Sequence, residues 1–239
     1  MDSPPDPLLS IRDLRFGWPG EDDLLDIPSF ELGWKDSVFL EGPSGSGKST
    51  LLGLITGILS PRAGTLRFDN TDLSTLSPSK RDKLRADRMG VVFQLFNLLP
   101  YLSVIDNVLL PCRFSALRRA NAEHRNKDLD DEAKRLLDRL GLRDQRLLHR
   151  KAGDLSVGQQ QRVAAARALI GAPDLIIADE PTSALDTESR NAFIELLMDE
   201  AADVGATLLF VSHDMTLADH FARRLSLTDL NKASVETRS

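Results

Sequence analysis

Four short apolar runs alternate with helical patterns along most of the chain. They read SVFL, MGVVF, LIIA and TLLFV and occupy residues 37–40, 89–93, 175–178 and 207–211. Runs that are this apolar are typical of strands in a parallel sheet that helices cover on both faces. The pattern therefore predicts an α/β fold.

The N-terminal segment has a different pattern. Residues 8–16 and 30–32 form short, partly alternating apolar runs. Between them lie residues that are typical of turns, namely Gly17, Pro19, Gly20 and Pro28. This arrangement predicts a small antiparallel β subdomain ahead of the parallel sheet.

Strand signals disappear between about residue 102 and residue 155. Within this stretch, the sequence DEAKRLLDRL places Leu136, Leu137 and Leu140 on one helical face, with charged residues opposite. Gly141 follows as a helix stop. The stretch is therefore predicted to be helical.

These patterns suggest how the chain is divided. We interpret residues 95–165 as an inserted α-helical subdomain and residues 1–94 and 166–239 as the two parts of one α/β core. The chain is expected to form a single domain, residues 1–239, without internal repeats.

The composition excludes several classes of protein. The 239 residues include 30 Lys and Arg against 36 Asp and Glu, so the formal net charge is −6 and nucleic-acid binding by bulk positive charge is not expected. Cys112 is the only cysteine, which excludes an intrachain disulfide and fits a reducing cytoplasm. The first ten residues, MDSPPDPLLS, do not resemble a signal peptide, and the apolar run at residues 51–59 is shorter than the ~18 residues of a membrane span.

Much of the positive charge lies in the insertion. Acidic residues are interleaved with it, and aromatic residues that could stack on bases are nearly absent after Phe114. We interpret the basic residues as part of a solvated helical surface rather than a nucleic-acid site. They are Arg113, Arg118, Arg119, Arg125, Lys127, Arg143, Arg146, Arg150 and Lys151.

A glycine-rich motif follows the first apolar run. It matches Gly, any four residues, then Gly-Lys-Ser, and it stands between a predicted strand and a helical run, as a phosphate-binding loop requires. Its backbone N–H groups can surround phosphate oxygens at the N-terminus of the helix. We expect Lys48 to neutralise β- and γ-phosphate charge and the Ser49 hydroxyl to ligate Mg²⁺. The motif consists of Gly42, Pro43, Ser44, Gly45, Ser46, Gly47, Lys48, Ser49 and Thr50.

The loop alone does not name the nucleotide. A GTPase would need Asn-Lys-x-Asp, and the similar string NKAS at residues 231–234 lacks the aspartate. The string DRMG at residues 87–90 fits Asp-x-x-Gly but precedes a strand instead of following one. We interpret both strings as chance matches.

A pair of carboxylates ends the third apolar run, in the sequence LIIADE. We expect Asp179 to lie beside the phosphate-bound Mg²⁺, directly or through water, and Glu180 to act as the general base toward an attacking water. An alternative is that the two acids only cap the next helix, an interpretation that Pro181 and Thr182 allow.

Residues 155–162, LSVGQQQR, complete a set of motifs that resembles the ATP-binding subunits of ABC transporters. The set contains, in order, the phosphate loop, Gln94 in VVFQ, the LSxGQ signature, the acidic strand end, SALD at residues 183–186 and His213 in VSHD. The resemblance covers nearly the whole chain. It implies an α/β, P-loop NTPase (RecA-like) core with an N-terminal antiparallel β subdomain and an inserted α-helical subdomain.

The resemblance also implies roles for single residues. Trp18 matches the aromatic that stacks on adenine, with a core tryptophan as the alternative. Gln94 would touch Mg²⁺ or the attacking water, and His213 would contact the γ-phosphate. Asp186 would lie at a dimer seam. The signature residues would bind the ATP held by the opposite subunit; they are Ser156, Val157, Gly158 and Gln159.

Val157 departs from the family pattern, which usually has glycine at this position. Valine tolerates a positive φ poorly, so this half of the site would be weakened if the position required a glycine conformation. We expect the two ATPase subunits still to close around ATP and to hydrolyse it.

The resemblance implies ATP and Mg²⁺ as ligands and a dimer of ATPase subunits, each bringing one phosphate loop and one signature. The apolar segment at residues 93–111 resembles the lipoprotein-release and macrolide-exporter branch, and part of it is a candidate docking groove, although most of its leucines are expected in the core. A separate transmembrane permease would hold the chain at the cytoplasmic face of the membrane, with export or extraction of a lipoprotein, lipid or small molecule as the expected task.

Two alternatives stay open. One is an ABC-type ATPase that acts on DNA or ribosomes without a permease, although the chain lacks the long coiled coils or second cassette typical of those members. The other is a regulatory ATPase of the cell-division type, which controls a membrane partner and moves no cargo. Co-purification with a membrane protein and cargo movement in reconstituted membranes would distinguish them.

Overall fold

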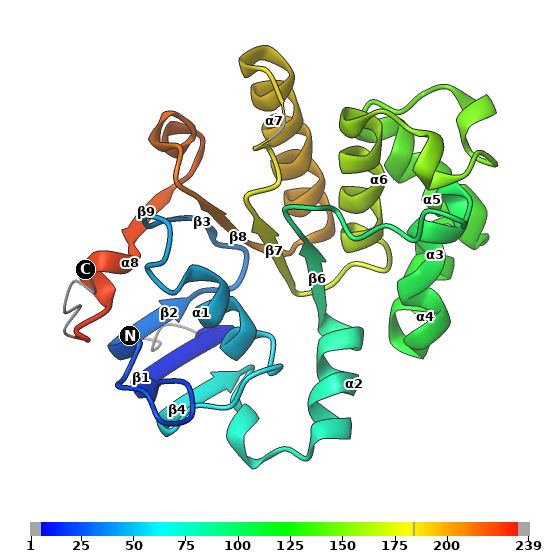
Figure 1. The fold of residues 1–239 in the computed structure, drawn as a ribbon. Coiled ribbons are helices and arrows are strands. Elements are labelled where there is room, and N and C mark those ends of the chain that lie inside the picture. Colours follow the sequence, from blue (N-terminus) through cyan, green and yellow to red (C-terminus); the bar gives the residue numbers. More distant parts are fainter. Residues whose placement is uncertain (1–5, 184, 234–239) are drawn as a thin grey trace, which may run out of the picture.

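Two β-sheets form the frame of the protein (Figure 1). The computed structural model describes residues 6–183 and 185–233. The first sheet is antiparallel, with strand order β2-β1-β4-β5, and the second is parallel, with order β6-β7-β8-β3-β9. The strands are β1 (Leu9–Phe16), β2 (Leu25–Leu32), β3 (Ser37–Glu41), β4 (Ala63–Phe68), β5 (Thr71–Asp72), β6 (Met89–Val92), β7 (Leu175–Asp179), β8 (Thr207–Ser212) and β9 (Arg223–Ser226).

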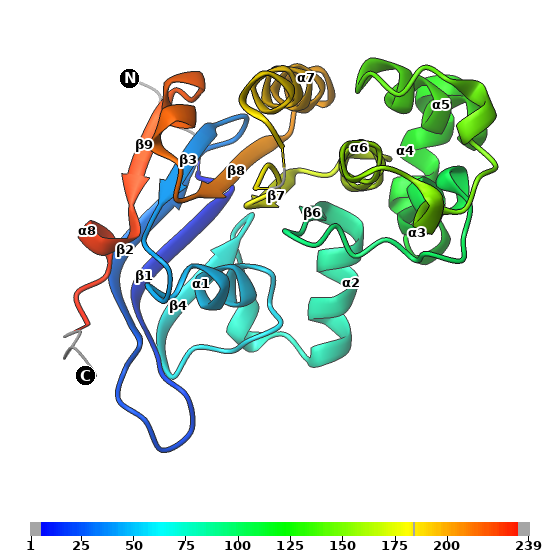
Figure 2. The same cartoon turned by 45° about the horizontal axis from the view of Figure 1, so that its top comes forward.

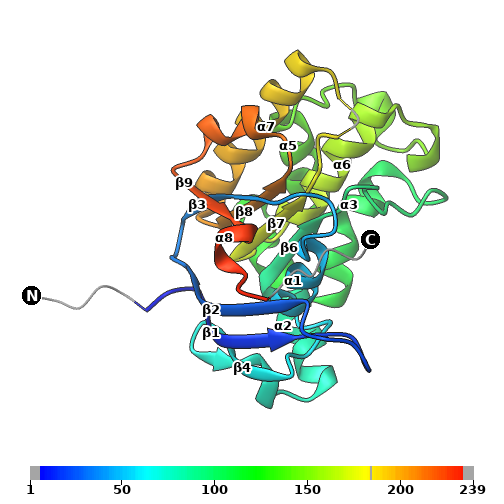
Figure 3. The ribbon, with the colours of Figure 1, turned by 60° about the vertical axis from the view of Figure 1, so that its left-hand side comes forward.

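Eight α-helices accompany these strands in the described residues. Helices α3, α4 and α5 lie beside α6, on the side of the parallel sheet away from the antiparallel strands (Figures 1 and 3). The helices are α1 (Lys48–Ile55), α2 (Pro78–Arg88), α3 (Val104–Phe114), α4 (Ala116–Asn126), α5 (Leu129–Arg139), α6 (Val157–Leu169), α7 (Thr187–Val204) and α8 (Leu227–Leu230). The predicted α/β fold is confirmed.

The parallel sheet separates two hydrophobic clusters, because successive side chains of a strand point to opposite faces. In β3, Val38 and Leu40 join the cluster formed with α1 and the antiparallel sheet, whereas Phe39 joins the cluster on the other face. Helix α1 is thus packed between the two sheets (Figure 2). Val38, Phe39 and Leu40 are all fully buried, which explains why the three central positions of this strand are apolar.

One strand differs from the expected pattern. Pro28, which we had interpreted as part of the turn region, lies inside β2. Strand β2 is at the edge of its sheet and pairs only with β1. Proline lacks a backbone N–H, and an edge strand tolerates this because one of its sides needs no ladder partner. The strand therefore begins at Leu25, five residues before the apolar run that predicted it.

The helix expected around residues 131–140 is α5. Asp128 caps it by accepting a hydrogen bond from the Asp130 N–H, and Leu136 and Leu137 are fully buried. A capped N-terminus with a leucine face toward the core stabilises a helix of this length. The sequence pattern here was sufficient to predict the local structure.

Arg118 corrects the interpretation of the basic residues as a solvated surface. This α4 side chain is only 2% exposed. Its guanidinium donates hydrogen bonds to the carbonyl oxygens of Ile170 (2.7 Å), Met89 (3.3 Å) and Ala168 (2.5 Å). Burial lowers the pKa of Arg118 to about 10. This arginine joins the insertion to α6 and β6 instead of facing solvent.

Buried carboxylates connect the insertion to α7. Glu132 on α5 and Glu200 on α7 are each 1% exposed. Arg135 donates to both carboxylates, and Arg139 pairs with Glu200. Breaking one partner of such a buried network is costly, so the C-terminal half of α7 is held firmly against the helical insertion.

Three further features of the sequence can be compared with the structure. Cys112 is buried. Within residues 6–183 and 185–233, no helix has the length and apolar character needed to cross a membrane. Two of the sequence segments discussed above lie partly outside the described residues. They are the N-terminal ten residues, of which residues 1–5 are not described, and the NKAS string, of which residue 234 is not described.

Candidate active site

The sheet order brings the predicted site residues together. In a parallel sheet the carboxyl ends of neighbouring strands meet at one edge, which is the usual place for ligand binding in α/β proteins. Strands β6, β7, β8 and β3 are consecutive neighbours. Their carboxyl ends lead into Gln94, the Asp179–Glu180 pair, His213 and the phosphate loop.

The phosphate loop connects β3 to α1. Gly45 and Gly47 have φ values of 79° and 95°, which a residue with a Cβ rarely adopts. Lys48, the first residue of α1, is 8% exposed, and its Nζ donates hydrogen bonds to the carbonyl oxygens of Gly42 (2.7 Å) and Pro43 (3.1 Å). The ammonium group is therefore held inside the loop.

Glu180 lies at the centre of the site. Its Oε1 atom is 3.6 Å from Lys48 Nζ and 3.1 Å from His213 Nδ1. Its φ of 44° is in the left-handed region, a conformation that costs a residue of this kind roughly 1–3 kcal/mol. The Glu180 N–H donates to the carbonyl oxygen of Val211 (2.9 Å), so β8 holds this strained residue in place.

Asp179 is less exposed to water than an ordinary surface carboxylate. Burial raises the pKa of Asp179, the charge of Glu180 raises it further, and Lys48 acts in the opposite direction. The two carboxylates do not cap a helix: α7 begins at Thr187, and Asp186 caps it by accepting from the Ser189 N–H (3.0 Å). The helix-cap alternative is therefore wrong.

A cavity of about 400 Å³ lies between the phosphate loop and the carboxylates. Its volume is in the range of small-molecule sites. The lining residues are Leu24, Ser44, Gly45, Gly47, Lys48, Ser49, Thr50, Gln94, Asp179 and Glu180.

The donors around this cavity fit Mg²⁺. Ser49, Gln94 and Asp179 offer a hydroxyl, an amide oxygen and a carboxylate, and Mg²⁺ takes such oxygen ligands together with substrate phosphates. No cluster of three or more His, Cys, Asp or Glu that could hold a metal occurs in the described part of the chain. The set therefore suits a cation that enters with a phosphate-bearing ligand.

Leu24 is a cavity residue that the sequence analysis missed. It immediately precedes β2 and borders the phosphate loop, and a Cβ at Gly47 would meet it and its neighbour Leu25. Nothing in the local sequence distinguishes this leucine from a core leucine. Only the packing of β2 against α1 places it at the cavity.

Among the described residues, the signature motif does not line this cavity. Ser156 and Gln159 form a capping box at the N-terminus of α6: the Ser156 hydroxyl accepts from the Gln159 N–H (3.3 Å), and the Gln159 side chain accepts from the Ser156 N–H (3.0 Å). Ser156 is exposed, whereas Gln159 is half-buried. The structure therefore builds the motif as a rigid helix start outside the phosphate-loop cavity.

Val157 is the first residue of α6 and is 48% exposed. It is not among the residues with a positive φ. A helical valine at this position needs no glycine conformation, so the backbone gives no reason for a weakened site.

We therefore expect Val157→Gly to change the ATP turnover number by less than about threefold, because removing an exposed side chain relieves no backbone strain. Glycine in the first helical turn is expected to lower the free energy of unfolding by up to about 1 kcal/mol. Steady-state phosphate release and urea unfolding measure the two effects. A many-fold gain in turnover would show that Val157 acts as a brake.

Trp18 and Asp186 also lie away from the cavity lining. Trp18 is 44% exposed in the loop between β1 and β2, with its ring centroid 5.3 Å from that of Phe16, so it is not a core tryptophan. Arg62 holds this loop by donating to the carbonyl oxygens of Trp18 (2.6 Å) and Glu21 (3.0 Å). Of the SALD motif, Ala184 lies outside the described residues.

Comparison with known proteins decides the family. Residues 25–183 match the family model described as ABC transporter. The chain belongs to the ABC transporter family. It is an ATPase of that family, as the predicted resemblance implied.

Relatives of this ABC ATPase include two lipoprotein-releasing system ATP-binding proteins named LolD. The one from Hydrogenovibrio crunogenus is 42% identical over 84% of this chain and 83% of the relative. LolD 1 from Caulobacter vibrioides is 41% identical over 83% of this chain and 81% of the relative. The macrolide export ATP-binding/permease protein MacB from Marinobacter nauticus is 40% identical over 93% of this chain, which spans only 31% of that longer protein.

A solved structure has the same fold. The bacterial ABC transporter cassette MJ0796, determined as a dimer, matches with a TM-score of 0.78 and 32% identity over 92% of this chain and 94% of that chain. A post-hydrolysis state of the same cassette, bound to ADP and Pi, matches with a TM-score of 0.76. The ABC ATPase described here therefore resembles these cassettes over nearly its full length.

Proposed function

We propose that this chain is the ATP-hydrolysing subunit of an ABC transporter of the LolD and MacB type, and that two copies close around two ATP molecules to drive a separate permease. The observation that carries the proposal is the convergence of Lys48, Glu180 and His213 beside a cavity of about 400 Å³. Phosphoryl-transfer sites combine a cation that neutralises phosphate charge with a group that orients the attacking water, and these three side chains can supply both functions.

In the proposed reaction, ATP and water give ADP and phosphate. The loop N–H groups and Lys48 hold the β- and γ-phosphates. Glu180 accepts a proton from the attacking water, and His213 orients the Glu180 carboxylate and contacts the γ-phosphate. Lys48 Nζ lies 3.6 Å from Glu180 Oε1 and helps to hold that carboxylate beside the phosphate. Catalysis is mainly positioning and charge stabilisation.

Ser49, Gln94 and Asp179 are the residues that would hold Mg²⁺. When bound, the cation supplies positive charge that neutralises the phosphate oxygens and orients them for in-line displacement. Asp179 is partly shielded from water in this cavity. Gln94 also lines the cavity and belongs to the segment that leads from β6 into the helical insertion.

A second copy would complete each site. The residues of the signature, Ser156 to Gln159, form a helix N-terminus that lies outside the cavity of its own chain. The positive end of the α6 dipole and its N–H groups are suited to the γ-phosphate held by a partner copy. Asp186 would lie at the seam between the copies, and Trp18 would stack on adenine from the exposed β1–β2 loop.

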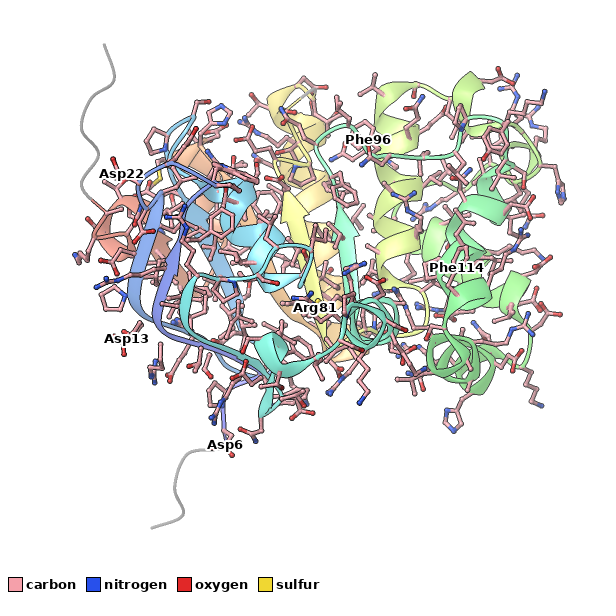
Figure 4. The ribbon with its side chains drawn as sticks, turned by 60° about the horizontal axis from the view of Figure 1, so that its bottom comes forward. Asp6, Asp13, Asp22, Arg81, Phe96 and Phe114 are labelled. Atoms are coloured by element: carbon pink, nitrogen blue, oxygen red, sulfur yellow. The ribbon has the colours of Figure 1, made fainter. Side chains whose placement is uncertain are left out.

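Exposed apolar side chains near the insertion are proposed to contact the permease. They belong to the segment after β6 and to the region where α3 meets α4, and Figure 4 shows Phe114 on the helical side of the molecule. Exposed apolar side chains that gather in one region can form a protein interface. They are Phe93, Leu95, Tyr101, Phe114 and Leu117. Residues 95–165 would then act as the subdomain that couples the permease to the core, at the cytoplasmic face of the membrane.

Co-expression with the permease encoded beside its gene tests the proposal. We expect a stable complex, Mg²⁺-dependent ATP hydrolysis and movement of a lipoprotein, lipid or small molecule in reconstituted membranes. Phe114→Asp, which changes a side chain 79% exposed, should lower complex recovery at least about tenfold, because it places a charge in an apolar interface.

Ile58→Asp is the matched control, since Ile58 is also exposed (62%) but lies after α1, outside the insertion. Equal loss of the complex in both variants would contradict the assigned docking surface. A complex that hydrolyses ATP and moves no cargo would favour a regulatory ATPase, and binding to DNA or ribosomes in place of the permease would overturn the transporter assignment.

A further inference from the structure

A second, smaller cavity borders Glu180 on the side away from the phosphate loop. Its volume is about 140 Å³, and Arg190, His213 and Asp214 line it together with Glu180. The sequence motifs imply roles for Glu180 and His213, but not for Arg190 or Asp214. The cavity places both of these residues beside the catalytic pair.

His213 is not held by burial. Its side chain is 62% exposed, and an exposed side chain has free access to other rotamers. Nevertheless its Nδ1 lies 3.1 Å from Glu180 Oε1. The position of this imidazole therefore depends on how firmly the backbone after β8 is anchored.

Asp214 provides that anchor within the loop. Its N–H donates to the Ser212 hydroxyl (3.1 Å), and its Oδ1 accepts from the Thr216 N–H (3.0 Å) and the Thr216 hydroxyl (2.7 Å). The hydrogen bonds from Thr216, together with the charge of Arg190, hold the pKa of Asp214 below its usual value. These bonds shape the loop, but they do not attach it to the rest of the protein.

Arg190 makes the attachment to α7. Its guanidinium pairs with Asp214 Oδ2, and its side chain is only 17% exposed, so solvent screens this pair less than a surface pair. Arg190 lies in the first turn of α7, where its N–H donates to the carbonyl oxygen of the capping residue Asp186 (3.0 Å). The arginine thus extends from a capped helix start.

The other end of α7 is held as well. Its Glu200 is buried and pairs with Arg135 and Arg139 of α5. A helix fixed at both ends is a rigid support for a side chain that it carries. Arg190 therefore transmits the position of α7 to the loop that carries His213.

We propose that Arg190 is a positioning residue for ATP hydrolysis, which acts through Asp214 to keep His213 facing Glu180. The inference rests on the proposed role of Glu180 as general base. Arg190 does not touch the phosphate-loop cavity in the described residues, so it contributes to the geometry of the hydrolytic step and not to nucleotide binding.

Arg190→Ala is expected to lower kcat about tenfold or more, because a small misplacement of a catalytic group has effects of that order. KM for ATP and the affinity for ADP should stay within about twofold of the wild-type values, since the phosphate loop is untouched. Arg190→Lys, which keeps the charge, should restore part of the lost kcat. Thermal unfolding checks that each variant remains folded.

The decisive measurement is the double variant with His213→Ala. If Arg190 acts through His213, the double variant should have nearly the same kcat as His213→Ala alone, because there is then no imidazole left for Arg190 to position. If the two losses multiply, Arg190 acts by another route and the inference is overturned.

Arg224→Ala is the matched control. Arg224 also pairs with an aspartate, Asp219, at the far end of the 3₁₀ segment Met215–His220 that follows Asp214. We expect its kcat to equal that of the wild type. A loss equal to that of Arg190→Ala would show that general stiffness of the segment matters, and not the link to His213.

The controls also distinguish this inference from the proposed function. If wild-type protein hydrolyses ATP and Glu180→Gln does not, but Arg190→Ala retains full kcat, only the inference on Arg190 fails. If Glu180→Gln retains full kcat, the proposed role of Glu180 itself fails, whatever the result for Arg190.

Discussion

Glu180→Gln is expected to lower ATP turnover by about 10²–10⁴-fold, the usual contribution of a general base. The amide has nearly the same shape as the carboxylate but cannot accept the proton of the attacking water. Because of this similar shape, the glutamine should keep contact with Lys48 and His213, which lie 3.6 Å and 3.1 Å from Glu180. ATP should therefore still bind. Phosphate release in a single turnover measures the loss.

The same variant is expected to accumulate as a dimer when ATP and Mg²⁺ are present. Hydrolysis would normally reopen the two copies, and the glutamine blocks that step while it also removes one negative charge beside the γ-phosphate. Size-exclusion chromatography with light scattering, with ATP and then with ADP, gives the oligomeric state. A variant that stays monomeric with ATP, and closes only when the permease is added, would refute autonomous dimerisation.

Glu195→Gln makes the identical chemical change on the exposed face of α7 and serves as the control. Its turnover and oligomeric state should match those of the wild type. Turnover within about fivefold of the wild type for Glu180→Gln would contradict the general-base assignment, since that is below the range for losing such a group.

Lys48→Ala has the second large expected effect, a loss of ATP affinity of about 10–100-fold, as expected when charge-assisted hydrogen bonds worth 1.5–3 kcal/mol are lost. Lys48 is 8% exposed and lies in the cavity lining with Ser49, Asp179 and Glu180. Lys48 is the one basic residue among the described residues that line the cavity, so its loss removes the positive charge that this chain places beside the phosphates and the two carboxylates. Calorimetric titration with ATP and Mg²⁺ measures the affinity.

The nucleotide series makes this prediction specific. The loss should be large for ATP, smaller for ADP and absent for AMP, because Lys48 is assigned to the β- and γ-phosphates. Lys83→Ala, which removes a 74% exposed lysine on α2, should leave all three affinities unchanged. An equal loss for AMP and ATP would indicate that Lys48 only supports the loop through its bonds to Gly42 and Pro43.

The sequence predicted well wherever the determining interactions are local. The phosphate loop needs glycines at fixed positions between a strand and a helix, and these are contiguous in the chain. The apolar runs identified strands to within one residue at their ends, because the central positions of strands buried on both faces are apolar. Helix α5 followed from the spacing of its leucines and from its charged opposite face.

The sequence was less informative where burial depends on distant parts of the chain. Arg118 has the same local pattern as its solvated neighbours, yet it is buried because three carbonyl groups from α6, the residue after α6 and β6 meet its guanidinium. Pro28 belongs to β2 because that strand is at the edge of its sheet, which no local pattern reveals. Leu24 lines the cavity only because β2 packs beside α1.

By itself, the sequence determined that this protein has a phosphate loop, an acidic strand end and the ordered motifs of an ABC ATPase, because each motif is a short contiguous string. The tertiary structure alone decided which residues meet. Lys48 and His213 are far from Glu180 in the chain, yet they lie 3.6 Å and 3.1 Å from it because β7, β8 and β3 are adjacent parallel strands. The Arg190–Asp214 pair is likewise tertiary: α7 packs against β8 and the segment that follows it, and a pairing between separate elements leaves no periodic trace in the sequence.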